Sequence, residues 1–227
     1  MKPYYQDDYA TIFHGDCRDI LPHVGHVDCV VTDPPYGMNL GKHGGANDTR
    51  TRELRRQSYA GYEDTPENYE IVVVPAIKKA LSLVERGAVF APAPSAWMLP
   101  PPTALGGIYI AAANGHSPWG FQNLAPVLLY GIAPDLHKGA KNTMHRSIGV
   151  ADRSCGHPCP KPVPWLHWLV GLVSRQGETI LDPFMGSGTT LRAAKDLERK
   201  AIGIEIEERY CEIAAKRLSQ EVLGFGT

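Results

Sequence analysis

The sequence lacks the features that mark exported and membrane proteins. Its richest apolar run, "PVPWLHWLVGLV" at 162–173, contains prolines and a histidine and is shorter than the roughly 20 apolar residues of a membrane span. The beginning, "MKPYYQDDY", has no apolar core of a signal peptide. The five cysteines are scattered and odd in number, which does not suit a disulfide framework. These absences predict a protein of the reducing cytoplasm with no membrane partner.

A strong excess of either charge is also lacking, since the formal net charge is −1 at pH 7. The charge is nevertheless uneven: residues 41–58 contain five basic side chains against two acidic ones, and residues 137–161 contain five against one. A protein that binds phosphates needs only a local basic face. Both segments are rich in glycine and polar residues, so they read as surface loops, either simply solvated or in contact with nucleic acid.

Strand-like and helix-like patterns alternate along most of the chain. The expected strands are 10–16, 26–33, 88–93, 107–113, 125–131, 178–184 and 200–206. The expected helices are 67–87, with Gly87 as its C-cap, 163–174, 189–199 and 207–222. This alternation predicts an α/β fold with a mainly parallel, doubly wound sheet and helices on both faces. The length of 227 residues fits a single domain, residues 1–227.

One apolar run, "VDCVVTDPPYG", ends on Asp33, Pro34, Pro35 and Tyr36. The two prolines lack the N–H that a sheet requires, so the strand stops there. The acid and the aromatic ring are then left at the carboxyl edge of the sheet, where ligands bind in open α/β folds. On these residues alone, a strand-ending turn with a surface tyrosine is the competing interpretation.

A second run, "LDPFMGSGTT" at 181–190, reads as a strand, a glycine turn and the start of a helix. Two glycines allow the backbone to approach a ligand, and the helix start offers free N–H groups. No lysine precedes the Thr pair, which argues against a Walker phosphate loop. The next strand ends with Glu205, placed to hold ribose hydroxyls. The pattern indicates a nucleoside-containing cofactor; a tight turn followed by a surface glutamate is the alternative.

Taken together, "TDPPYG", "HPCPKP" at 157–162 and "DPFMGSGTT" resemble the β class of amino-group DNA methyltransferases, which use S-adenosylmethionine (SAM). The resemblance covers residues 10–36 and 155–220 well and the middle only in outline. It implies a circularly permuted, Rossmann-like SAM-dependent methyltransferase fold. The strands near 178–184 and 200–206 would be its first and second, and those at 10–14 and 27–33 its third and fourth.

The resemblance also implies the site residues. Asp33, Pro34, Pro35 and Tyr36 would be catalytic. Asp16 would bond the adenine of SAM, and Lys161 matches the lysine of an "HPTQKP"-like segment, although Cys159-Pro160 replaces the usual Thr-Gln. The implied SAM-binding residues are Asp16, Cys17, Lys161, Asp182, Phe184, Gly186, Ser187, Gly188, Thr189 and Glu205. No metal is expected, because the C-x-H-x-C run of Cys155, His157 and Cys159 is too tight for a usual structural zinc site.

The expected reaction is methyl transfer to the exocyclic N6 of a flipped-out adenine in a specific DNA sequence. The lone pair of that amino group is delocalised, and acceptors at Asp33 and the Pro34 carbonyl would turn it toward the methyl group while Tyr36 stacks on the base. Serine more often replaces Asp33 in the N4-cytosine enzymes, so Asp33 favours adenine. N4-cytosine methylation, an RNA substrate and an inactive SAM- or DNA-binding accessory protein remain alternatives.

The expected partner is double-stranded DNA, contacted by loops 37–66 and 134–157. A homodimer and a cognate restriction endonuclease stay open. The expected location is the cytoplasm of a bacterial or phage-infected cell, in association with the nucleoid.

Overall fold

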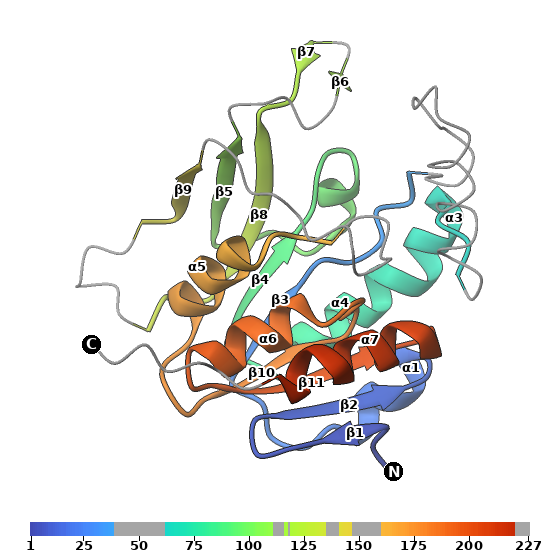
Figure 1. Cartoon of the computed structure of the whole chain (residues 1–227). Helices are drawn as coiled ribbons and strands as arrows, with labels where there is room; N and C mark the ends of the chain where they lie inside the picture. The colour runs from blue at the N-terminus through green and yellow to red at the C-terminus, as the bar shows by residue number, and fades with distance from the viewer. Residues whose placement is uncertain (39–61, 111–115, 118, 135–140, 147–159, 221–227) are drawn as a thin grey trace, which may run out of the picture.

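The structure is a computed structural model that describes residues 1–38, 62–110, 116–117, 119–134, 141–146 and 160–220. One nine-stranded sheet dominates it, in the order β1-β2-β11-β10-β3-β4-β8-β5-β9 (Figure 1). The central strands β2, β11, β10, β3 and β4 are parallel, whereas β8 is antiparallel to both β4 and β5. The strands are β1 Tyr5–Gln6, β2 Ala10–His14, β3 Cys29–Thr32, β4 Arg86–Phe90, β5 Ala104–Ile110, β8 Leu124–Tyr130, β9 Thr143–Arg146, β10 Thr179–Asp182 and β11 Lys200–Glu205, with β6 His116–Ser117 and β7 Gly120–Phe121 forming a separate pair.

Helices cover both faces of the sheet, as the alternation of strands and helices predicts (Figure 1). On the central strand β3, Cys29 and Val31 face the core beneath α5, α6 and α7, and Val30 faces the core beneath α1 and α4. Because successive strand residues point to opposite faces, the continuous apolar run of β3 supplies both cores. The helical segments are α1 Cys17–Ile20, η1 Leu21–His23, α3 Pro66–Asn68, η2 Tyr69–Val73, α4 Val74–Leu81, η3 Ser95–Met98, α5 Val163–Val173, α6 Thr189–Asp196 and α7 Glu208–Ser219.

The neighbouring strands β3 and β10, in the middle of the sheet, come from opposite ends of the chain. Strand β10 pairs in parallel with β3 through Ile180 opposite Cys29 and Leu181 opposite Val30. Helices α6 and α7, which follow β10 and β11, lie on one face, whereas α1 and α4, which follow β2 and β3, lie on the other. The connections therefore diverge between β10 and β3, which is the switch point where ligands bind in open α/β sheets.

The predicted helix over 67–87 is wrong at its C-terminal end. Helix α4 ends at Leu81 with Ser82 as its C-cap, and Gly87 lies inside strand β4. Gly87 has a packing role instead, since a Cβ there would lie 2.7 Å from the Leu81 side chain. The helix is also interrupted: the π-helix η2 precedes Pro75, which has no N–H to donate.

Strand β9 lies within residues 137–161, which the sequence predicts to be a surface loop. It forms by pairing in parallel with the edge of β5, with Tyr109 opposite His145. These two rings stack with centroids 4.7 Å apart. The pairing partner, rather than a periodic pattern in residues 143–146, accounts for this strand.

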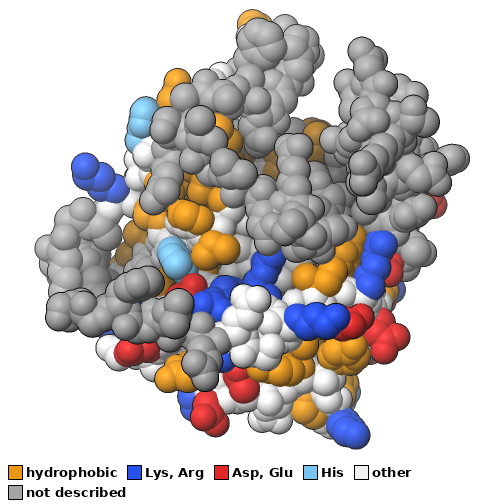
Figure 2. Space-filling model, in the orientation of Figure 1, with side chains coloured by type: hydrophobic (Ala, Val, Ile, Leu, Met, Phe, Trp, Pro, Cys, Tyr) orange, Lys and Arg blue, Asp and Glu red, His pale blue; other side chains and the backbone are white. Residues whose placement is uncertain are grey.

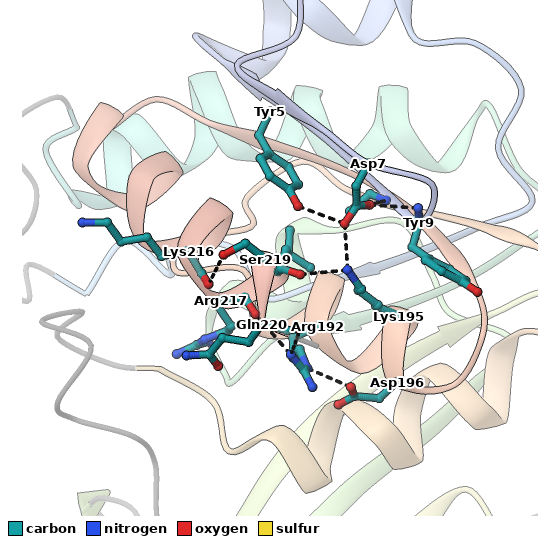
Figure 3. A network of polar contacts seen from close by, with 12 residues as sticks. Tyr5, Asp7, Tyr9, Arg192, Lys195, Asp196, Lys216, Arg217, Ser219 and Gln220 are labelled. Carbon is teal, nitrogen blue, oxygen red and sulfur yellow. Dashed lines mark hydrogen bonds and ion pairs between the residues drawn. The ribbon is translucent and has the colours of Figure 1, made fainter. Parts of the chain in front are cut away.

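Polar contacts join the beginning of the sheet to α6 and to the end of α7 (Figure 3). Lys195 Nζ on α6 donates to Asp7 Oδ2 and to the Leu218 carbonyl, both at 2.8 Å. Arg192 donates to Asp196 at 2.7 Å and to the Arg217 carbonyl at 3.2 Å. We call the contacts of Asp7, Lys195 and Leu218 the terminal clasp.

Lysine and arginine side chains gather over α6 and α7 on the face shown in Figure 2. Within the protein, Arg192 and Lys195 on α6 donate to carbonyls near the end of α7, and Arg217 on α7 donates to Thr189 Oγ1 at 2.8 Å. These contacts stabilise the packing of α6 against α7. Within the described ranges, no helix is both long and apolar enough to cross a membrane.

Candidate functional site

The catalytic residues predicted after β3 form a compact polar group. Asp33 accepts hydrogen bonds on both carboxylate oxygens, from the Tyr36 hydroxyl and from Lys161 Nζ, the latter at 2.5 Å. Lys161 Nζ also lies 3.3 Å from the Tyr36 hydroxyl and 5.4 Å from the ring centroids of Tyr36 and Phe90. The cation thus sits between a carboxylate and two aromatic faces, where both the charge pair and the rings stabilise it.

Two buried side chains hold the backbone of Tyr36 and of the two residues after it. Ser95 Oγ donates to the Tyr36 carbonyl at 2.6 Å. Asp64 accepts from the N–H groups of Gly37 at 2.7 Å and Met38 at 3.2 Å. The exposed fractions of Ser95 and Asp64 are 2% and 5%. These contacts fix the turn that carries Tyr36.

The glycine turn lies at the tip of β10, next to β3. Gly186 and Gly188 have φ angles of +52° and +75°, which favour glycine. A Cβ on Gly188 would lie 2.6 Å from the Ala214 Cβ, so this glycine also lets α6 pack closely on α7. The Gly186 N–H donates to Glu205 Oε2 at 2.9 Å. The turn and the acid at the end of β11 are therefore in direct contact.

Burial shifts the pKa of two acids at this edge. Burial raises the pKa of Glu205 to about 7, although the N–H groups of Glu207 and Gly186 act in the opposite direction. Burial likewise raises the pKa of Asp182 to about 6, opposed by hydrogen bonds from Thr190 and Thr32. Asp182 accepts from Thr32 Oγ1 at 2.7 Å and from the Phe184 N–H at 3.1 Å. It thereby ties the tip of β10 to the tip of β3.

The tip of β2 lies beside the same edge, because the Gly15 N–H donates to the Glu205 carbonyl at 2.9 Å. Asp16 caps α1 through the Arg18 N–H at 2.8 Å, and its carboxylate pairs with the Arg18 guanidinium at 2.6 Å. Cys17 is buried, and burial raises the pKa of its thiol to about 12. Cys17 is therefore a neutral packing group, whereas Asp16 keeps its charge at the rim.

Comparisons with known proteins agree with this geometry. The N6/N4 methyltransferase family model, described as DNA methylase, matches residues 118–216. Type II methyltransferase M2.DpnII of Streptococcus pneumoniae is 48% identical over 65 residues, which are 29% of this chain and 24% of that protein. Type II methyltransferase M.HpaI of Haemophilus parainfluenzae is 42% identical over 69 residues, 30% of this chain and 22% of that protein. The chain thus spans about a quarter of the length of these curated relatives.

Solved structures match over nearly the whole chain. The PvuII DNA methyltransferase (cytosine-N4-specific) has a TM-score of 0.67 at 14% identity, covering 98% of this chain and 91% of that one. A putative DNA modification methylase from Thermus thermophilus, complexed with S-adenosyl-L-methionine, has a TM-score of 0.63 at 22% identity, covering 94% and 95%. The chain has the fold of the SAM-dependent DNA methyltransferases. The predicted fold class and the resemblance to amino-group DNA methyltransferases are confirmed, with N6 and N4 both open.

The methyltransferase fold brings the predicted site residues to one edge of the sheet. Asp33 to Tyr36 follow β3, and the neighbouring β10, β11 and β2 deliver the glycine turn, Glu205 and Asp16. Lys161 Nζ lies on Asp33 and Tyr36, and its contact with SAM stays a prediction. Pro34, Ser187 and Thr189 are buried, and Pro35 and Phe184 are partly buried.

Asp64 and Ser95 hold the turn that carries Tyr36, and sequence reasoning did not single out either one. Asp64 follows a stretch without periodicity, and Ser95 lies in a proline-rich turn, so no pattern marks either one. Of the predicted DNA-contacting loops 37–66 and 134–157, the parts 39–61, 135–140 and 147–157 lie outside the described residues. Cys155, His157 and Cys159 lie outside them as well. Among the residues that are described, no three His, Cys, Asp or Glu side chains are grouped to hold a metal.

Proposed function

We propose that this chain transfers a methyl group from SAM to the exocyclic N6 of a flipped-out adenine in a specific DNA sequence. One observation carries the proposal. Asp33 and Tyr36 follow β3 and are contacted by Lys161, and the glycine turn in contact with Glu205 follows the adjacent β10. A base held at the first and a nucleoside cofactor held at the second would meet at the switch point of the sheet.

The residues at this edge fit SAM. Glu205 offers a carboxylate to the ribose hydroxyls, next to the N–H groups of the glycine turn. Asp16 and the buried Cys17 follow β2, the strand beside Glu205, where the adenine ring would lie. Bound there, SAM supplies an activated methyl group on its sulfonium. Asp182 supports the turn through the Phe184 N–H, beside the proposed SAM site.

Asp33 would orient the amino group that reacts. A carboxylate has about four lone-pair positions, and the Tyr36 hydroxyl and Lys161 use two of them. One of the others can accept an N–H of the target amine, and the Pro34 carbonyl can accept the second. These bonds favour a tetrahedral nitrogen and so stabilise the transition state more than the flat ground state.

Tyr36 and Lys161 would complete the site. The Tyr36 hydroxyl is fixed on Asp33, so the ring presents a defined face for a flipped base. Lys161 compensates the carboxylate charge when the base excludes water. The target nitrogen would then accept the methyl group that SAM supplies at this edge of the sheet. The amine proton, strongly acidic after transfer, then leaves to Asp33 or to water.

The substitution Asp33→Asn tests this assignment. We expect methyl transfer to DNA to fall at least about a hundredfold, because the variant loses a charged acceptor aimed at the reacting group. The dissociation constant of SAM, measured by calorimetry, should change less than about threefold. The matched control is Asp28→Asn, since Asp28 precedes the same strand and accepts the Thr179 N–H at 2.8 Å far from its tip. Unchanged turnover in Asp33→Asn would reject the mechanism.

The base is identified by incubating unmodified genomic DNA with the protein and SAM and mapping modified positions by single-molecule sequencing. N6-methyladenine in one sequence context is the expected result. N4-methylcytosine would replace the adenine assignment, and no methyl transfer to DNA would favour an RNA substrate or an accessory role.

Residues 37–66 and 134–157 are proposed as the DNA-contacting loops of a single domain. The Type II class of the relatives supports a cognate restriction endonuclease as a further proposal.

A further inference from the structure

The turn after Pro35 is held by two buried side chains that contact its backbone. Ser95 Oγ donates to the Tyr36 carbonyl, and the two oxygens of Asp64 accept the next two backbone N–H groups, those of Gly37 and Met38. Three consecutive residues thus each have one backbone group fixed by a side chain. The anchors come from two separate segments, one before α3 and one in η3.

Tyr69 closes the same turn from another side. Gly37 has a φ of +69°, and a Cβ on it would lie 2.8 Å from the Tyr69 Cβ, so backbone and side chain are in close contact. The Tyr69 hydroxyl donates to the Ser95 carbonyl at 3.1 Å, which fixes the serine in turn. Tyr69 is fully buried, with an exposed fraction of 1%. The turn therefore has no room to shift without breaking several contacts.

A buried carboxylate is costly unless it is hydrogen-bonded, and here Asp64 accepts from the two backbone N–H groups next to Tyr36. We propose that Asp64 and Ser95 are positioning residues for methyl transfer, which hold the Tyr36 backbone so that Tyr36 and Asp33 meet the flipped base in the reactive geometry. The inference rests on the proposed function. A displacement of about 1 Å at such a site can cost about a hundredfold in rate, so a positioning role should appear in kcat.

The test is a graded series at Asp64. Asp64→Asn keeps one acceptor oxygen for the Gly37 N–H but turns an NH₂ group toward the Met38 N–H, and Asp64→Ala removes both acceptors. We expect kcat to fall about tenfold in the first variant and further in the second, with the KM for SAM within about twofold of wild type. Ser95→Ala, which removes a single donor, should lower kcat about three- to tenfold. If the Asp64 variants do not fold, Ser95→Ala alone tests the proposal.

Two matched controls separate positioning from stability. Asp7→Asn alters a carboxylate that likewise accepts two backbone N–H groups, those of Tyr9 at 2.8 Å and Ala10 at 2.6 Å, far from the site. Ser174→Ala removes a buried hydroxyl that donates to the Val170 carbonyl at 2.6 Å, the same distance as in Ser95. Both controls should lower the melting temperature and leave kcat within about twofold of wild type.

A double variant adds a readout that a purely structural role would not move. If Asp64 acts through Tyr36, then Asp64→Asn should cost much less kcat in a Tyr36→Ala background than in wild type. Equal kcat losses in both backgrounds, or losses no larger than those of the controls, would overturn the inference while leaving the proposed function intact. A wild-type protein that transfers no methyl group to DNA would overturn both.

Discussion

At the scale of single residues, two opposing effects set the pKa of Glu205. Burial raises the pKa of its carboxyl to about 7 from a usual 4.5, while N–H donors from Glu207 and Gly186 favour the ionised form. Between those two pH values the folded protein binds more protons at this group than the unfolded chain. Its contribution to stability therefore decreases as the pH rises from 4.5 to 7. Ribose hydroxyls that donate to Glu205 would favour its ionised form and so lower its pKa, against the effect of burial.

This competition predicts a pH dependence of cofactor binding. With a pKa of about 7, roughly one carboxyl in ten is ionised at pH 6 and nine in ten at pH 8, so SAM should bind about ten times more weakly at pH 6. Isothermal titration calorimetry at both values measures this. Glu205→Gln should bind SAM weakly at both, whereas the exposed Glu212→Gln should behave as wild type. An equal affinity at pH 6 and pH 8 in the unmodified protein would contradict the role of Glu205.

At the scale of elements, the segment entering α5 completes the polar group of the proposed catalytic site. Pro162 is the N-cap of α5, and the residue before it places its Nζ on Asp33, 128 positions earlier in the chain. The resemblance implies that Lys161 contacts SAM, but a motif gives the order of residues and not the direction of a long side chain. The structure gives that direction: the cation lies above the Tyr36 and Phe90 rings.

Replacing Lys161 with methionine keeps most of its apolar stem and removes the charge. We expect kcat to fall about tenfold or more, since Asp33 loses its cation in a partly buried site, while SAM affinity changes less than about threefold. Lys195→Met is the matched control, because Lys195 also pairs with an aspartate, at 2.8 Å, and lies 5.8 Å from the Tyr9 ring centroid. A loss of SAM affinity with unchanged kcat would instead support Lys161 as a SAM contact.

Elements differ in how far the sequence predicts them. The tips of β3 and β10 follow directly from apolar runs that end at prolines and glycines, because these residues cannot extend a strand. The close approach of Gly87 to Leu81 depends on how the end of α4 packs on β4. Asp64 and Ser95 act through single contacts with backbone groups across a turn. Such contacts leave no period in the sequence, so they require coordinates.

At the scale of the whole molecule, the permuted order of the strands leaves the first strands and the last helix as neighbours. The terminal clasp joins them: Lys195 Nζ contacts Asp7 Oδ2 and the Leu218 carbonyl, and Tyr5 donates to Asp7 at 2.9 Å. Burial alone would raise the pKa of Asp7, but the bonds from Lys195, Tyr9 and Ala10 outweigh it and lower the pKa. The ionised carboxylate is thus the form that the folded state stabilises.

The clasp should therefore stabilise the fold without affecting the reaction. In a double-mutant cycle with Asp7→Asn and Lys195→Met, we expect a coupling energy of about 1–2 kcal/mol at pH 7 from chemical denaturation. The stabilisation is fully present above the unfolded pKa of Asp7 and is lost as the pH falls through its lowered folded pKa, so the coupling should vanish in acid. The double variant should keep wild-type kcat at a temperature where it is folded. Zero coupling at pH 7 would mean that α6 and α7 hold the first strands by apolar packing alone.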